Sequence, residues 1–344
     1  MIQNINEKYN KYYKLSLLLP IALILLSFVI IYHTYSTTGD FMHKDISLTG
    51  GTTITLFSDT SASDLKKALS GKIADLEVRG LSDNSGKQTQ LVILTSDSSE
   101  KATPIIEEYL GFKLTNVNSS VEFTGSNLSN DFYKQLIIAC LLAFFWMAAV
   151  VFIIFAKGLK IKFLAVVLNL LFGLFLGKIL LSMDIIAGTI TTLVFIAVLV
   201  FLYIKYSMPS FAVMFCAFAD IVMTLAVVDV VGMKISGAGI IAFLMLIGYS
   251  VDTDILLTTR VLRRKEGSVN SEIFSSFKTG MTMTLTAMAA IAVALFFVHS
   301  YETALNQIFT ILLIGLSFDI LNTWVTNTAL LKWFVERKTG EQKI

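Results

Sequence analysis

Carboxylates inside apolar segments are the side chains of this sequence that could do chemistry. Asp220 lies near the middle of the apolar run 210–231, and Asp319 lies near the centre of the run 305–331. An Asp at the centre of a membrane helix costs about 2.5 to 3.5 kcal/mol on an insertion scale, so it must face protein, water or a partner. Such a group can be neutral in one conformation and ionised in another, because its desolvation changes. We therefore interpret both acids as candidates for an ion-responsive site.

Two further acids lie in the run 236–258. Asp252 sits in the inner half of this run, about 7–8 Å beyond its midpoint at helical rise. Asp254 is expected to lie at the membrane surface, where it can reach the headgroups. The two acids are about 200° apart on a helix, so they cannot share a face or act as a catalytic pair. Arg260 is the nearest cation in the sequence and could pair with either acid across helices.

Polar stripes accompany the acids on the last two runs. The stripe that falls within about 60° of Asp319 on a helix consists of Asn322, Thr323 and Thr326. A similar stripe on the preceding run consists of Thr279, Thr282 and Thr286. Together the stripes predict a polar seam between helices. Hydrogen bonds that only join helices are one interpretation of this seam, and a pathway is the other.

Glycines mark two further candidate positions. Gly248, next to Tyr249, is expected to allow close approach of helix backbones in the seam. Gly50 and Gly51 follow the first apolar run, where a glycine pair indicates either a β-bulge or a close approach of two backbones.

The composition is that of an integral membrane protein. Of the 344 residues, 55% are hydrophobic and only 15% are charged, whereas a soluble domain has about 25% charged residues. The net charge of +2 indicates neither a nucleic acid nor an acidic substrate as a partner. The two cysteines and three histidines show no disulfide or metal-ligand spacing, and no GxxxxGK[ST] motif for ATP occurs.

Apolar runs organise the chain. The first, 15–35, follows a basic start and is interpreted as a retained anchor, because it is longer than the apolar region of a signal peptide and no cleavage site follows it. Further runs have the roughly 20 residues that cross about 30 Å of hydrocarbon. They lie at about 134–156, 162–181, 185–205, 210–231, 236–258, 279–298 and 305–331. The sequence therefore predicts about eight spans.

The loop charges predict the orientation. Basic residues gather at 157–162, at 260–265 and near the C-terminus, which is the cytoplasmic side if the N-terminus is cytoplasmic. The predicted domains are a cytoplasmic N-terminus with the first span at 1–35, an extracytoplasmic domain at 36–130, a helix bundle at 131–335 and a cytoplasmic tail at 336–344.

The polar stretch 36–130 is expected to form a small α+β domain. Alternating apolar residues predict strands at 46–57, 74–81, 89–95 and 112–123. The middle two are expected to be joined by a turn at 83–86. Capping serines predict helices after Ser61 and after Ser98. The resulting order β-α-β-β-α-β is that of a ferredoxin-like unit.

Four stretches resemble the SecF family in its archaeal form. The most specific is Gly-Tyr-Ser-Val-Asp-Thr-Asp-Ile-Leu-Leu-Thr-Thr-Arg at 248–260. The others lie at 48–52, 279–286 and 319–324. SecF is the smaller of the paired SecD and SecF subunits of the protein-export machinery, in the RND superfamily. The resemblance covers residues 1–156 loosely and residues 207–335 closely.

The resemblance implies a polytopic helix bundle in the cytoplasmic membrane, surrounded by lipid, which assists protein export without being an enzyme. Its implied partners are a SecD-type subunit, a SecY-type channel and the exported unfolded polypeptide, and the proton motive force is the implied energy source. Asp220 and Arg260 lie where bacterial members have an Asp and an Arg. Gly50 and Gly51 would serve motion of the outer domain. Because six spans are usual in the family, 157–206 is predicted to hold an inserted helical hairpin.

Two other functions are weaker alternatives. An RND-type half-transporter for lipid or small molecules would predict a second, larger outer domain and a repeat of the six-span unit, and these 344 residues show neither. An intramembrane aspartyl protease that uses Asp220 and Asp252 would need a Gly-x-Gly-Asp type motif, which 248–252 is not. We therefore expect no enzyme, no cofactor and no metal.

Overall fold

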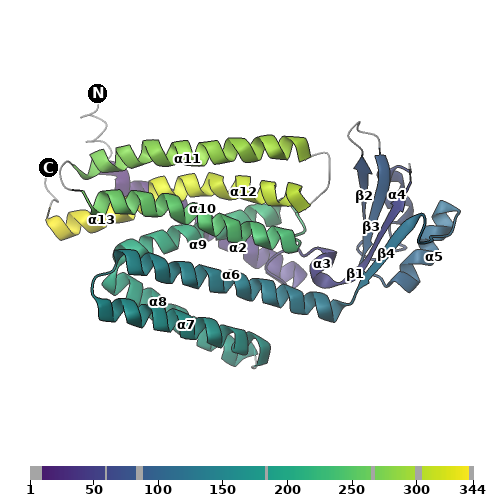
Figure 1. Cartoon of the computed structure of the whole chain (residues 1–344), viewed down its shortest axis with the longest axis horizontal. Helices are drawn as coiled ribbons and strands as arrows, with labels where there is room; N and C mark the ends of the chain where they lie inside the picture. Colours follow the sequence, from purple (N-terminus) through teal and green to yellow (C-terminus); the bar gives the residue numbers. More distant parts are fainter. Residues whose placement is uncertain are drawn as a thin grey trace.

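A bundle of long helices carries a small domain with a four-stranded sheet at one end (Figure 1). The computed structural model describes residues 10–58, 60–82, 88–182, 185–264, 268–298 and 304–340. The expected turn at 83–86 and the two ends of the chain, 1–9 and 341–344, lie outside the described residues.

Six helices of the described part are long and apolar enough to cross a membrane. They are Asn10–Thr38, Ser126–Phe155, Met208–Val230, Gly237–Leu262, Val269–Val298 and Ala304–Lys338. The first contains α2 (Leu18–Thr38), and the next four are α6, α9, α10 and α11. The last consists of α12 (Ala304–Leu321), a π-helix η1 (Asn322–Asn327) and α13 (Thr328–Thr339). The membrane class predicted from composition is thereby confirmed.

The segment predicted as a hairpin contains α7 (Leu159–Ser182) and α8 (Ile185–Tyr206), which pack on the flank of α6 and α9 (Figure 1). Phe152 of α6, Phe172 of α7 and Tyr203 of α8 share one buried apolar cluster. Neither helix is among the six described spans, although Thr191–Tyr206 is a shorter apolar helix. The predicted count of eight spans therefore stays a prediction.

The outer domain has one antiparallel sheet in the order β2-β3-β1-β4. Its elements are β1 (Gly51–Phe57), α4 (Ala62–Leu69), β2 (Glu77–Ser82), β3 (Gln88–Thr95), α5 (Ser99–Leu110) and β4 (Ser119–Thr124). Alternation explains which side is the core. Ile54 and Leu56 of β1 lie opposite Ile93 and Leu91 of β3, and all four side chains are fully buried in the cluster that includes α4 and α5.

Three of the predicted strands are shorter than expected; the one at 74–81 begins at Glu77, and the other two begin at least five residues late. The segment 46–57 begins as a single helical turn, α3 (Ile46–Thr49), whose last N–H groups bond back to the carbonyl of Asp45, and the strand begins only at Gly51. The segment 112–123 forms a strand only from Ser119, because a turn closed on the carbonyl of Thr115 precedes it. In both places local hydrogen bonds replace the expected ladder.

The glycine pair joins α3 to β1 where two backbones approach closely. Gly50 and Gly51 have φ values of +86° and +150°, which glycine tolerates best. A Cβ on Gly50 would lie 2.6 Å from the Cα of Ser126, and a Cβ on Gly51 would lie 2.2 Å from the carbonyl oxygen of Thr95. Of the two predicted alternatives, the close approach is therefore the one that the structure shows.

We predict that Gly51→Ala destabilises the outer domain. The backbone conformation alone costs about 1–3 kcal/mol for a residue with a Cβ, and the clash with the Thr95 carbonyl adds to this cost. Thermal unfolding of the purified protein, followed by limited proteolysis of the outer domain, measures the effect. Gly125→Ala is the matched control, because its φ is −63° and no atom lies within 4 Å of the added Cβ. Equal melting temperatures for the two variants would contradict the prediction.

Candidate functional site

Three acids from three helices meet inside the bundle. Asp220 on α9, Asp254 on α10 and Asp319 on α12 are each at most 1% exposed. Asp220 and Asp254 both lie close enough to Asp319 to repel it electrostatically. We call these three residues the acidic cluster. The structure thus brings Asp220 and Asp319 together, and it adds Asp254, which was expected at the membrane surface.

Asp220 has a donor for each of its carboxylate oxygens. The Ser250 hydroxyl on α10 donates to Oδ2 at 2.6 Å, and Nδ2 of Asn322 on η1 donates to Oδ1 at 2.7 Å. The Thr224 hydroxyl donates to the backbone carbonyl of Asp220. Because these donors replace the hydrogen bonds to water, they offset much of the free energy that is lost when a carboxylate is buried.

The other two acids are only half satisfied. Asp254 accepts from Nδ2 of Asn327 at 2.7 Å, and Asp319 accepts from the Thr323 hydroxyl at 3.1 Å. The second carboxylate oxygen of each has no hydrogen-bond partner among the described residues. In the same part of the chain, no ion pair involves the acidic cluster. Like charges repel strongly where the dielectric constant is low, so a gain or loss of positive charge here must change these contacts.

The described ranges contain no group of three or more His, Cys, Asp or Glu side chains placed to hold a metal ion. The carboxylates of the acidic cluster supply hydrogen-bond acceptors to the bundle interior. The chemistry that this arrangement supports is the uptake and release of a small cation such as the proton.

The polar stripe predicted around Asp319 lies in the π-helix. Asn322, Thr323 and Thr326 are buried, and the Thr326 hydroxyl donates to Oδ1 of Asn322 at 3.2 Å. Sequence reasoning missed Asn327, because a regular α-helix would place it about 140° from Asn322. The signal that could have found it is the density of Asn and Thr in one otherwise apolar span.

The expectation that Asp254 lies at the membrane surface is wrong, whereas Asp252 and Asp254 do face opposite sides of the helix, as predicted. Asp254 is fully buried, whereas Asp252 is exposed. The reason is the rotation of α10 about its axis. Asp254 shares the buried face with Ser250 and Leu257, and Asp252 shares the outer face with Tyr249, which is 44% exposed.

Arg260 does not pair with either acid, contrary to the sequence-based possibility. Its Nη1 instead donates to the carbonyl of Ser275 at 3.2 Å and to the hydroxyl of Thr279 at 3.1 Å, both on α11. Thr282 and Thr286 are exposed and donate to carbonyls of their own helix. The threonine stripe on α11 therefore faces away from the acidic cluster and is not part of the polar seam.

The predicted close approach at Gly248 is also wrong. Gly248 lies at the surface, and a Cβ there would meet no atom within 4 Å. Helices approach closely at two other glycines instead. A Cβ on Gly280 would lie 2.4 Å from the ring of Trp324, and a Cβ on Gly315 would lie 2.4 Å from the side chain of Leu246.

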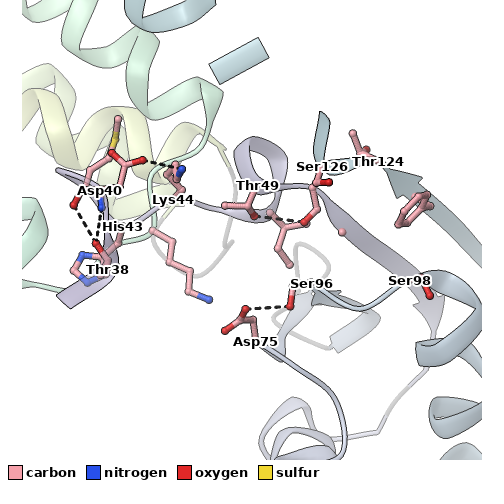
Figure 2. Close-up of a pocket in the computed structure, with 16 residues that line it drawn as sticks. Thr38, Asp40, His43, Lys44, Thr49, Asp75, Ser96, Ser98, Thr124 and Ser126 are labelled. Carbon is pink, nitrogen blue, oxygen red and sulfur yellow. Dashed lines mark hydrogen bonds and ion pairs between the residues drawn. The ribbon is translucent and has the colours of Figure 1, made fainter. Parts of the chain in front are cut away.

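A cleft of about 650 Å³ separates the bundle from the outer domain (Figure 2). On the bundle side, Lys44 pairs with Asp40 at 2.8 Å. On the domain side, the Ser96 hydroxyl donates to Asp75 at 3.0 Å. Gly50 and Gly51 line the cleft together with these side chains, so the connection between the two parts runs along its edge.

Comparison with known proteins identifies the family. Residues 173–337 match the family model of the C-terminal part of the protein-export membrane proteins SecD and SecF. The chain is also 32% identical to the protein-export membrane protein SecF of Methanocaldococcus jannaschii, over 94% of this chain and 96% of the relative. The chain belongs to the SecF family. SecF of Pyrococcus furiosus is 29% identical over 96% of this chain and 93% of its own. The resemblance carried by residues 248–260 is thereby confirmed.

A solved structure shares the fold. SecDF from Thermus thermophilus, described as a translocon-associated membrane protein, superposes on 96% of this chain with a TM-score of 0.59. The sequence identity is 16%, so this likeness concerns the fold alone. The present chain corresponds to 38% of the length of that SecDF chain.

We predict that Asn322→Ala destabilises the bundle. The substitution leaves one buried oxygen of Asp220 without a donor, which costs about 1–3 kcal/mol. The melting temperature of the purified protein in mild detergent measures this loss. Thr282→Ala is the control, because Thr282 is exposed and donates only to a carbonyl of its own helix. An Asn322→Ala protein as stable as the control would show that this hydrogen bond contributes nothing.

Proposed function

We propose that this SecF-family chain is an accessory subunit of the Sec protein-translocation machinery. It would act with a SecD-type subunit at a SecY-type channel, and promote the export of unfolded polypeptides across the cytoplasmic membrane. The observation that carries the proposal is the relationship to SecF along nearly the whole chain. The proposed role is mechanical, without an enzymatic step or a cofactor. The relationship to SecF does not favour the alternative, an RND-type half-transporter, and the partner experiment below tests against it.

The proposed topology places both termini in the cytoplasm and the outer domain, 36–130, on the far side of the membrane. Basic residues at 157–162 and 260–264 lie at or just beyond the ends of α6 and α10 that point away from the outer domain (Figure 1). We count α7 and α8 as an inserted pair of spans, which makes eight. The order β-α-β-β-α-β with the sheet order β2-β3-β1-β4 supports a ferredoxin-like outer domain.

A direct chain of contacts would couple the acidic cluster to the outer domain. Asp220 and Asp254 lie on α9 and α10, and the short loop between these helices holds the segment before β1. In that loop, the N–H of Ile235 donates to the carbonyl of His43 at 2.7 Å, and its carbonyl accepts from the N–H of Asp45 at 2.9 Å. A shift of α9 or α10 caused by proton uptake would therefore move the base of the outer domain. We propose the proton motive force as the energy source.

An exposed acid supports a partner inside the membrane. One face of α10 presents a row of exposed side chains on successive turns, Ile241, Met245, Tyr249 and Asp252. Asp252 lies ten residues before the end of the span, so lipid chains would leave its carboxylate without hydrogen bonds. We propose that the SecD-type subunit covers this face.

Asp220→Asn and Asp319→Asn are each expected to slow export several-fold while the protein still inserts into the membrane. The amide cannot take up and release a proton, whereas it keeps the size of the carboxyl group. Export of a secreted reporter in cells, with membrane levels of the variants measured in parallel, tests this. Asp64→Asn on the exposed surface of α4 is the matched control. Normal export with either variant would remove that acid from the mechanism.

Asp252→Lys is expected to release the SecD-type partner. A charge reversal on the exposed face of α10 would repel a cation or bury an unpaired charge at the interface. Tagged protein is purified in mild detergent, and the partner is identified by mass spectrometry. The unmodified chain and Asp64→Lys should both retain the partner. A homotrimer of the unmodified chain without a second subunit would favour the half-transporter instead.

A further inference from the structure

The π-helix η1 directs two asparagines to acids on two different helices. Nδ2 of Asn322 donates to Asp220 on α9, and Nδ2 of Asn327 donates to Asp254 on α10, both at 2.7 Å. In an α-helix, residues five apart lie about 140° apart around the axis. A π-helix bonds each residue to the fifth one along, so residues five apart lie closer to one face than they do in an α-helix.

Hydrogen bonds within η1 stabilise the wide turn. The N–H of Thr328 bonds the carbonyl of Thr323, five residues earlier, and the Thr328 hydroxyl donates to the same carbonyl at 2.9 Å. In a regular α-helix, this carbonyl would accept from the N–H of residue 327 instead. All three of Thr323, Asn327 and Thr328 are at most 1% exposed, so the turn is enclosed by protein.

We propose that Asn327 is a positioning residue for Asp254, and that the π-helix is the element that lets one helix hold two acids at once. This inference rests on the proposed role of the acidic cluster as an ion-responsive site. If η1 became α-helical, the two asparagines would lie about 140° apart around the helix axis. Asp220 and Asp254 could then no longer both be held.

The same turn connects the acidic cluster to the cytoplasmic end of the bundle. α13 continues directly from η1, and its Lys332 is only 2% exposed. The Lys332 ammonium donates to Asn270 at the start of α11 at 2.7 Å, and also to Asn10 in the first span. A change in the register of η1 would rotate α13 and pull on both contacts. The π-helix is thus placed to pass a change in hydrogen bonding at the acids to three spans.

Infrared spectroscopy of the purified full chain in lipid nanodiscs, titrated from acid to alkaline pH, tests this proposal. Asp254→Asn identifies the carboxyl stretching band of Asp254, and Asp220→Asn identifies that of Asp220. Asn327→Ala is expected to move the Asp254 band to higher wavenumber, because its carboxyl group loses a donor, and to change the pH at which this band titrates. Asn322→Ala should do the same to the Asp220 band only.

A second variant keeps the test decisive where alanine prevents folding. Asn327→Gln retains an amide but displaces it by one methylene, so it should also move the Asp254 band. A folded variant of either kind with the Asp254 band unmoved would overturn the proposal, and so would an equal shift of both bands. Export is not the readout, so a chain that fails in the export assay could still show the expected bands. Failure of the proposed function and failure of this inference are therefore distinguishable.

Discussion

A carboxylate inside a membrane protein requires hydrogen-bond donors at fixed places, and this requirement organises the bundle. Asp220 takes one donor from α10 and one from the last span, both at hydrogen-bond distances of 2.7 Å or less. Three helices must therefore keep their relative rotation and height. Close contacts at Gly315 against Leu246 join α12 to α10, and close contacts at Gly280 against Trp324 join α11 to the last span. Polar contacts between membrane helices contribute only about 0.6–2 kcal/mol each, so such an arrangement can change when one charge changes.

The acids could be found from the sequence, but their surroundings could not. An Asp in the middle of an apolar run stands out whatever the fold, which is why Asp220 and Asp319 were predicted correctly as buried polar residues. Helical geometry also showed that Asp252 and Asp254 face opposite ways. It could not show which of the two faces inward, because that depends on the rotation of α10 against its neighbours. For the same reason Arg260, the nearest cation in the sequence, turned out to bind α11.

In the outer domain, alternating apolar residues were enough to predict one strand over nearly its whole length. The alternation that predicted a strand at 89–95 corresponds to β3 (Gln88–Thr95), since β3 lies inside the sheet with one face covered by helices. The same pattern failed at 46–49 and before Ser119, because backbone groups there found nearer partners in turns. The π-helix could not be predicted from periodicity, because the helical pattern assumes 3.6 residues per turn throughout.

The direct connection between the outer domain and α6 would let this long helix act as a lever. β4 ends at Thr124 and α6 begins at Ser126, so a single residue separates the edge of the sheet from a rod of 30 residues. At 1.5 Å per residue the rod is about 45 Å long, and pivoting it by about 5° carries its outer tip roughly 4 Å sideways. Small tilts of this size cost little in a bilayer. A small tilt of α6 within the bundle would therefore move the attached outer domain by several ångströms.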